Sequence, residues 1–250
     1  MIEVDPIAVA GDSETGGPRV SEADPAVRTW RVRGQVKAVV LVLHGGAEHS
    51  HARVAPWRLA YQRMVPLAKE VHRAGREHGV EVRLLRNRIY GWNDHGTDAL
   101  ADARWALERI REDHPGVPVV LVGHSMGGRV ALRVADDPAV IGVCALAPWT
   151  PPGEPIGAVD GRVVLIAHGT KDRMTDPVAS HAFAERAEKV TSRSARFEIG
   201  GEGHAMLRRS RVWNRLVRAF TLELIEAGGT DETVSAAWDR PSSERLRIPV

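Results

Sequence analysis

Short, nearly continuous apolar runs alternate along the chain with longer segments whose apolar residues have helical spacing. Such runs are typical of strands buried in a parallel sheet. They lie at 36–46, 80–92, 119–122, 139–149, 161–172 and 194–204, and residues 27–34 alternate like a half-exposed strand. Helical spacing predicts helices at 56–79, 97–115, 176–190 and 206–226. This order predicts an α/β fold: one mostly parallel, doubly wound sheet with helices on both faces.

Local signals mark the ends of the predicted helices. Pro66 should interrupt the helix at 56–79, because proline lacks the backbone N–H that a helix interior needs. Thr97 is a suitable N-cap for the next helix. Asp176 followed by Pro177 predicts a further helix start, with aspartate as the cap and proline at the first position.

Composition divides the chain into three parts. Residues 1–25 are rich in Gly, Pro, Asp, Ser and Glu, and we expect a flexible leader there. Residues 26–227 contain all the predicted strands and helices, which makes them the α/β domain. Residues 228–250 are polar and lack periodicity, so we expect a mobile C-terminal tail.

Composition also narrows the class of protein. The 250 residues are 43% hydrophobic and 26% charged, with a formal net charge of +2, and no long basic block indicates a nucleic-acid partner. No segment approaches the roughly 20 apolar residues of a membrane span, so integral membrane association is not expected. The N-terminus lacks the basic start and apolar stretch of a signal peptide, and Cys144 is the only cysteine. We therefore expect a soluble, cytoplasmic protein; its oligomeric state is left open.

The run at 119–122 leads into the pentapeptide GHSMG at 123–127, which matches the pattern G-x-S-x-G. In this pattern a serine sits in a strained turn between a strand and a helix, and glycines let the two elements approach. Ligands of open α/β sheets bind at the carboxyl ends of the strands, where this turn lies. The pattern therefore predicts Ser125 as a nucleophile.

Two further ionisable residues, Asp172 and His204, follow strands at the same edge. A serine hydroxyl is a poor nucleophile at neutral pH and needs an adjacent base. Histidine suits that role, so His204 would take the serine proton and return it to the leaving group. Asp172 would hold the imidazole in the right tautomer and stabilise the imidazolium.

Other residues compete for these roles. Asp176 also follows the strand, but its Asp-Pro context favours helix capping, so we assign Asp172 as the acid. His168 lies inside the apolar run and is interpreted as a core or pocket histidine. His49 and His51 have a faint metal-like spacing without a third ligand, so we expect neither a metal nor another cofactor.

The developing oxyanion of an acyl transfer needs preorganised N–H donors. The backbone of Met126 can supply one from the start of a helix, and that of Gly46 another from the loop after its strand. Trp92, Trp149 and Met206 also follow strands at this edge, and we expect them to form the apolar walls of the substrate pocket.

Four motifs resemble those of serine α/β-hydrolases, in the branch of monoacylglycerol lipases and lysophospholipase-like enzymes. They are LHGGAEHS at 43–50, GHSMGG at 123–128, HGTKDRMTDP at 168–177 and GEGHAML at 201–207. The resemblance spans about residues 26–226 and includes the chain order Ser, Asp, His. It implies a Ser125–Asp172–His204 triad, with Gly46 and Met126 as oxyanion donors.

The chain departs from these lipases where they carry a helical cap. Only the Pro/Gly-rich stretch at 150–161 stands there, which is too short for a cap and predicts an open cleft. We therefore expect a hydrolase that cleaves carboxylic esters of short to medium acyl chains through an acyl-enzyme, with a small-molecule ester as its partner. The same triad would also serve a thioesterase, an acyltransferase or an amidase. A ligand-binding, receptor-like protein is the alternative from another class.

Overall fold

The computed structural model describes residues 25–227 and 231–250, and up to residue 227 its strands and helices follow the order that the sequence predicts. The strands are β1 (Ala26–Trp30), β2 (Ala38–Leu43), β3 (Val80–Arg86), β4 (Val119–His124), β5 (Val140–Leu146), β6 (Val163–Gly169), β7 (Arg193–Ile199) and β8 (Ile248–Pro249). The helices are α1 (Leu59–Gln62), α2 (Met64–Gly75), α3 (Thr97–Asp113), α4 (Met126–Arg133), α5 (Pro177–Ala187), α6 (Ser210–Leu224), α7 (Glu232–Trp238) and α8 (Ser242–Arg245). Short 3-10 turns lie at η1 (Arg76–His78), η2 (Asp94–Gly96) and η3 (Gly157–Val159).

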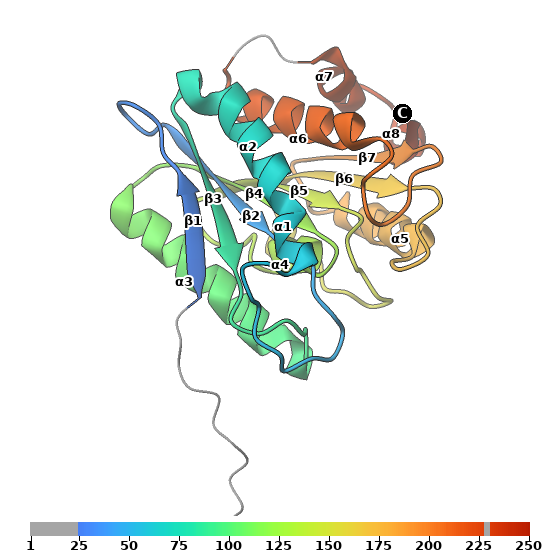
Figure 1. The fold of residues 1–250 in the computed structure, drawn as a ribbon. Coiled ribbons are helices and arrows are strands. Elements are labelled where there is room, and N and C mark those ends of the chain that lie inside the picture. The colour runs from blue at the N-terminus through green and yellow to red at the C-terminus, as the bar shows by residue number, and fades with distance from the viewer. Residues whose placement is uncertain (1–24, 228–230) are drawn as a thin grey trace, which may run out of the picture.

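The strands form a single sheet in the order β1-β3-β2-β4-β5-β6-β7-β8 (Figure 1). Strand β1 pairs antiparallel with β3, and every other pair is parallel. Strands β2 to β7 therefore end at one common edge, where the loops after β2, β4, β6 and β7 carry the residues singled out from the sequence. The expected α/β fold is confirmed.

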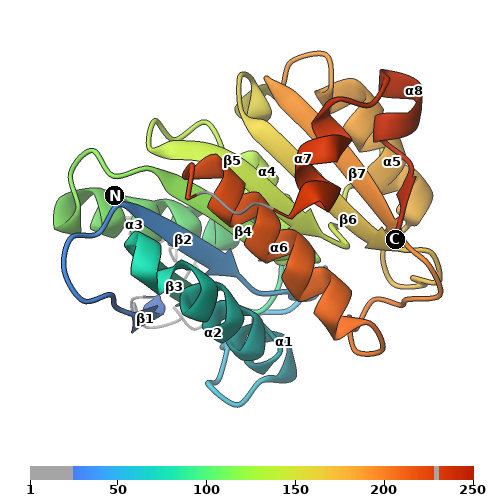
Figure 2. The ribbon, with the colours of Figure 1, turned by 90° about the horizontal axis from the view of Figure 1, so that it is seen from above.

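Helices cover both faces of the sheet, and Figure 2 separates the two layers. Helices α2 and α6 lie on one face, whereas α3, α4 and α5 lie on the other. Side chains of a strand alternate between the faces: Val40 and Val42 belong to the apolar cluster under α2 and α6, and Val39 and Leu41 to the opposite cluster. Burial on both sides explains why the strands are apolar throughout.

The C-terminal segment corrects the expectation of a mobile tail. Residues 231–250 form α7, α8 and β8, and β8 extends the sheet by pairing Ile248 with Phe197 of β7. Val234 and Ile248 are at most 3% exposed and join the cluster under α6. These apolar residues are too few and too scattered to give a periodic signal. The folded unit thus continues beyond residue 227; the expected leader falls on residues 1–24, outside the described residues.

The helix boundaries test three finer predictions. The helix is interrupted at Arg63, between α1 and α2. Pro66 lies in the first turn of α2, where a backbone N–H would have no partner within the helix, so its absence costs nothing. Asp176 caps α5 as expected, its Oδ1 accepting from the Val178 N–H at 2.8 Å. The expected cap at Thr97 is wrong: Thr97 is the first residue of α3, and its hydroxyl donates to the Asp94 carbonyl at 2.7 Å.

None of the described helices combines the length and apolar character needed to cross a bilayer.

Candidate active site

Ser125 occupies the turn between β4 and α4, with φ of 57° and ψ of −120°. This region of backbone space is unfavourable for residues other than glycine and is found at functional sites. Two glycines allow the turn to be this tight. A Cβ on Gly123 would lie 2.1 Å from the Gly127 carbonyl oxygen, and one on Gly127 would lie 2.4 Å from the Leu43 carbonyl oxygen. Strand β4, helix α4 and the end of β2 are thus in backbone contact around Ser125.

Backbone hydrogen bonds hold this turn in place. The Ser125 N–H donates to the Leu146 carbonyl at 3.0 Å, and the Ser125 carbonyl accepts from the N–H groups of Arg129 and Trp149, each at 3.2 Å. The end of β5 and the residues after it therefore fix the turn from one side. Ser125 itself is 8% exposed at the carboxyl edge of the sheet.

Asp172 and His204, which lie on different loops, meet directly. Oδ2 of Asp172 is 2.8 Å from Nδ1 of His204. Oδ1 of the same carboxylate accepts from the N–H groups of Met174 and Thr175, at 2.8 and 3.1 Å. With Nδ1 engaged by the carboxylate, the tautomer that carries its proton there leaves Nε2 as the basic atom of His204.

The surroundings of Asp172 favour its ionised form. Burial alone raises the pKa of this carboxyl group. Hydrogen bonds from His168, His204 and the backbone N–H groups of Met174 and Thr175 outweigh burial and hold the Asp172 pKa well below its usual range. The side chain is therefore a carboxylate at neutral pH, as the stabiliser of an imidazolium must be.

His124 links the histidine loop to the serine turn. Its Nε2 lies 2.9 Å from the carbonyl oxygen of His204, and the two imidazole rings have centroids 4.7 Å apart. Burial lowers the pKa of His124 to about 3, so the ring is neutral and donates this hydrogen bond. His124 immediately precedes Ser125, so this contact brings the His204 loop against the turn.

The glycine loop after β2 packs against the same turn. A Cβ on Gly45 would lie 3.3 Å from Cβ of Ser125, and one on Gly46 would lie 2.5 Å from Sδ of Met126 and 2.3 Å from the Tyr90 carbonyl oxygen. Strands β2 and β4 pair directly, which explains why their following loops meet. The structure thus brings the two predicted oxyanion donors, Gly46 and Met126, side by side next to Ser125.

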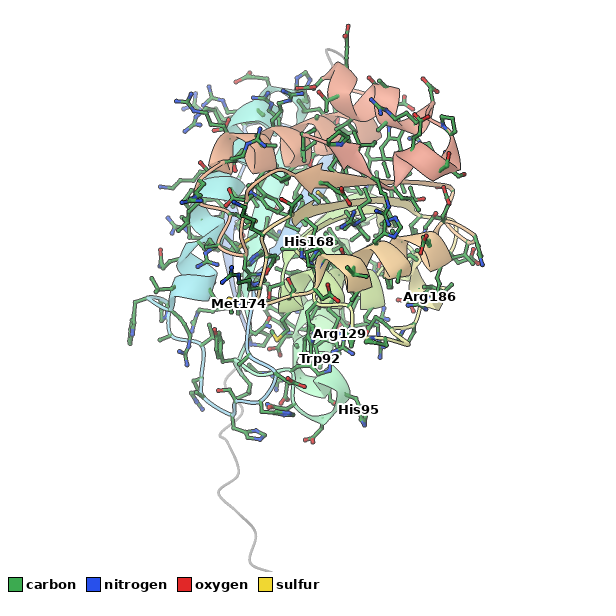
Figure 3. All side chains as sticks on the ribbon, turned by 90° about the vertical axis from the view of Figure 1, so that its right-hand side faces the viewer. Trp92, His95, Arg129, His168, Met174 and Arg186 are labelled. Carbon is green, nitrogen blue, oxygen red and sulfur yellow. The ribbon has the colours of Figure 1, made fainter. Side chains whose placement is uncertain are left out.

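The predicted pocket residues have other neighbours than expected. The Arg129 guanidinium carbon lies 4.0 Å from the ring centroid of Trp92 and 4.5 Å from that of Trp149, and Glu154 pairs with Arg129 at 2.6 Å (Figure 3). Arginine stacked on aromatic rings and paired with a buried carboxylate ties segments together. Met206 is 7% exposed and belongs to the apolar cluster under α2 and α6. Arg129 thus lies against both tryptophan rings.

A surface groove of about 550 Å³ lies beside the glycine loop. It is lined by Arg53, Ala55, Trp57, Arg58, Leu59, Ala60 and Tyr90. Tyr90 connects the groove to the site, because its carbonyl oxygen packs against Gly46 and accepts from the Ala47 N–H at 3.1 Å. Trp57 and Leu59 are each 78% exposed, which is high for side chains of their size.

Sequence reasoning assigned no chemical role to three buried histidines around this centre. His44 directly follows β2, His124 ends β4, and His168 is the last residue but one of β6. Burial lowers the pKa of His44 to about 4; its Nδ1 lies 2.6 Å from the Gly45 carbonyl and its Nε2 accepts from the Asn87 N–H. All three histidines lie at the ends of parallel strands, and this shared position was the signal in the sequence that could have identified them.

Within residues 25–227 and 231–250, no group of three or more His, Cys, Asp or Glu side chains is arranged to hold a metal ion.

Comparison with known proteins agrees with the fold. The model of the Alpha/beta hydrolase family matches residues 39–250, and the chain belongs to that family. Human (Homo sapiens) Monoglyceride lipase is 28% identical over 112 residues, which are 44% of this chain and 34% of that protein. The Mus musculus protein of the same name is 28% identical over 111 residues, with the same two shares. The match thus spans about a third of the length of these relatives.

Solved structures share the fold. Monoacylglycerol lipase of Paleococcus ferrophilus has a TM-score of 0.59 at 16% identity, over 82% of this chain and 100% of that chain. A Xanthomonas campestris serine hydrolase described as having no lid has a TM-score of 0.58 at 20% identity, over 81% of this chain and 88% of that chain. The resemblance to α/β-hydrolases that the sequence motifs indicated is confirmed.

Proposed function

We propose that this protein is a serine-dependent hydrolase that cleaves carboxylic esters of short to medium acyl chains through an acyl-enzyme. The observation that carries the proposal is the 2.8 Å contact between His204 Nδ1 and Asp172 Oδ2, on a loop that His124 joins to the strained turn of Ser125. A nucleophile, a base and an ionised acid at one sheet edge are the parts that acyl transfer requires. Membership of the alpha/beta hydrolase family, with monoglyceride lipases among its relatives, agrees with ester hydrolysis.

In the proposed reaction, Oγ of Ser125 attacks the ester carbonyl carbon while Nε2 of His204 takes the hydroxyl proton. The Asp172 carboxylate stabilises the imidazolium. The tetrahedral intermediate then collapses: the bond between the carbonyl carbon and the alcohol oxygen breaks, and His204 returns the proton to that oxygen. A water molecule, activated by His204 in the same way, hydrolyses the acyl-enzyme to release the carboxylic acid and regenerate Ser125.

The N–H groups of Gly46 and Met126 would stabilise the oxyanion in both steps. Met126 is the first residue of α4, and the first backbone N–H groups of a helix have no partner within it and carry its positive dipole end. Gly46 packs against the side chain of Met126, and Met126 directly follows Ser125 in the turn. Each such donor contributes about a hundredfold or more to kcat.

The preference for short to medium chains rests on the missing cap. In the described structure, the connection from β5 to β6 holds only the 3-10 turn η3 as a helical element. Each acyl methylene buried in a tunnel adds about 0.8 kcal/mol, but an open groove buries only the first few. The groove lined by Trp57 and Leu59 would receive these methylenes. We expect kcat/KM to rise with chain length and level off at about six to eight carbons.

Labelling and turnover measured on one preparation test the proposal. A fluorophosphonate should label wild-type protein and Ser242→Ala, which alters an exposed serine on α8, but not Ser125→Ala. Esters of two to twelve acyl carbons should be hydrolysed by the same two proteins, with Ser125→Ala several orders of magnitude slower. If Ser125 is labelled but none of the esters, thioesters or amides tested is hydrolysed, the proposal is contradicted and a binding protein is favoured.

A further inference from the structure

A second histidine contacts the carboxylate that orients His204. His168, labelled in Figure 3, is fully buried near the end of β6. Its Nε2 lies 3.2 Å from Oδ2 of Asp172. The chain turns sharply after this strand, the Asp172 N–H donating to the Gly169 carbonyl at 3.1 Å. This turn brings the carboxylate back over a histidine four residues earlier, so Oδ2 faces His204 on one side and His168 on another.

The polar neighbours of His168 show which of its ring nitrogens donates a hydrogen bond. Among the residues that the structure describes, its buried Nδ1 has no hydrogen-bond partner. Its Nε2 faces two oxygens, Oδ2 of Asp172 at 3.2 Å and Oγ1 of Thr175 at 3.4 Å. A carboxylate oxygen can only accept a hydrogen bond, and a hydroxyl oxygen can accept one as well. Nε2 of His168 therefore carries a proton, which makes His168 a donor towards both oxygens.

Thr175 completes this cluster. Its hydroxyl lies 2.9 Å from Oδ2 of Asp172, 3.1 Å from Nδ1 of His204 and 3.1 Å from the Ala147 carbonyl oxygen. A hydroxyl has one proton to donate and can also accept. It therefore accepts from Nε2 of His168 while donating to an oxygen, which couples His168 to Asp172 by a second route.

We propose that His168 is a positioning residue of the active site: its Nε2–H acts on Asp172, directly and through Thr175, and fixes the carboxylate that orients His204. This inference rests on the proposed function for its kinetic consequences. The contacts themselves belong to the resting protein and can be tested without turnover.

Removing the donor has a defined consequence. When the Asp172 carboxylate loses the hydrogen bond from His168, it attracts the proton on Nδ1 of His204 more strongly. The protonated imidazole is then held more firmly, and His204 becomes available as a base only at higher pH. The acid limb of the kcat/KM profile should therefore move to higher pH.

Other titratable groups near this centre do not produce that shift. His124 faces His204 from the end of β4, with Arg63 acting on it at longer range. Burial keeps the pKa of His124 at about 3, so it stays neutral over the range of the assay.

Three variants test the proposal. His168→Leu removes the donor, and kcat/KM on its plateau should fall roughly ten- to a hundredfold, the loss expected for one hydrogen bond to a charged group. Its acid limb should move up by about one pH unit. His168→Gln, whose amide N–H reaches about as far as Nε2, should restore the acid limb. His181→Gln alters a partly buried histidine of α5 that contacts Arg247 and lies outside this cluster, and it should match wild type.

A spectroscopic readout separates this inference from the proposed function. The proton NMR signal of the Nδ1–H of His204, recorded on resting protein, should move downfield in His168→Leu and return in His168→Gln. Should the leucine variant not fold, His168→Asn replaces it, since its shorter amide does not reach Asp172. Leucine and glutamine variants with the same acid limb and the same proton signal as wild type, differing only in melting temperature, would overturn the inference. The two proposals can also fail separately. If the proton signal shifts in His168→Leu but Ser125→Ala keeps full activity, the contact of His168 with Asp172 is upheld and Ser125 is not the nucleophile.

Discussion

The serine turn and the acid–histidine pair lie at the same edge of the sheet but are held by different forces. Ser125 is fixed by backbone: hydrogen bonds to β5 and glycine contacts of 2.1 to 2.4 Å for any added Cβ leave the turn no room to change. Asp172 is fixed by hydrogen bonds to its carboxylate, from the His204 and His168 side chains and from backbone N–H groups. The turn therefore tolerates almost no added volume, whereas the pair is sensitive to charge and to hydrogen-bond donors.

Because of this difference, substitutions in the two regions should change different properties of the protein. A methyl group added at the turn should unfold or distort it, with stability as the main readout. An isosteric change at the carboxylate keeps the volume and should leave the fold intact while changing the chemistry.

Asp172→Asn should lower kcat about 10⁴-fold, because an amide no longer selects the productive tautomer of His204 or stabilises its charge. Asp176→Asn is the matched control, since asparagine caps a helix about as well as aspartate and Asp176 caps α5. Steady-state kinetics on one ester, with melting temperatures beside them, check both variants. The reverse ranking would exchange the roles of the two carboxylates.

Gly127→Ala should destabilise the protein by about 3 kcal/mol, because its Cβ would lie 2.4 Å from a carbonyl oxygen of the neighbouring strand end. Gly157→Ala is the control, since a Cβ there meets no heavy atom within 4 Å. Urea unfolding gives both values. Equal stability of the two variants would show that the turn is not held by close backbone packing.

Asp172 should also make stability depend on pH. Its pKa is lowered in the folded protein, so the ionised carboxylate stabilises the fold above the ordinary carboxyl pKa, and that stabilisation is lost as the pH falls below about 4. The melting-temperature difference between wild type and Asp172→Asn should thus be largest near neutral pH and shrink towards pH 3. Calorimetry across this range checks the sign; a difference that grows on acidification would contradict it.

Trp57→Ala should have the smallest effect, and only on longer substrates. Loss of an apolar groove wall should lower kcat/KM for octanoate esters about five- to tenfold and leave acetate esters unchanged. Met174→Ala is the control, since Met174 is also 78% exposed but does not line the groove. If kcat/KM of the wild-type protein instead rises steadily up to twelve acyl carbons, the proposal that an open groove binds the acyl chain is wrong, regardless of the results with the two variants.

The fold class could be predicted because its signals are local. Apolar runs such as the one at 119–122 identify strands that are buried on both faces, and the glycines around Ser125 mark a close approach of backbones. Asp176 with Pro177 fixed a helix start for the same reason. The residue types that suit a base and its acid also stood out at strand ends, and the structure places Asp172 and His204 in contact.

Local signals were enough to predict the order of strands and helices up to residue 227, the serine turn and the residues suited to chemistry, because these depend on near neighbours and on backbone sterics. The packed structure was needed to show that residues 231–250 complete the sheet through β8, that Arg129 lies against Trp92 and Trp149, and that His168 faces Asp172. Each of these depends on side-chain direction and on partners distant in sequence or brought together by a turn. Periodicity reports which face a residue occupies, but the packing of the whole chain decides which atoms meet there.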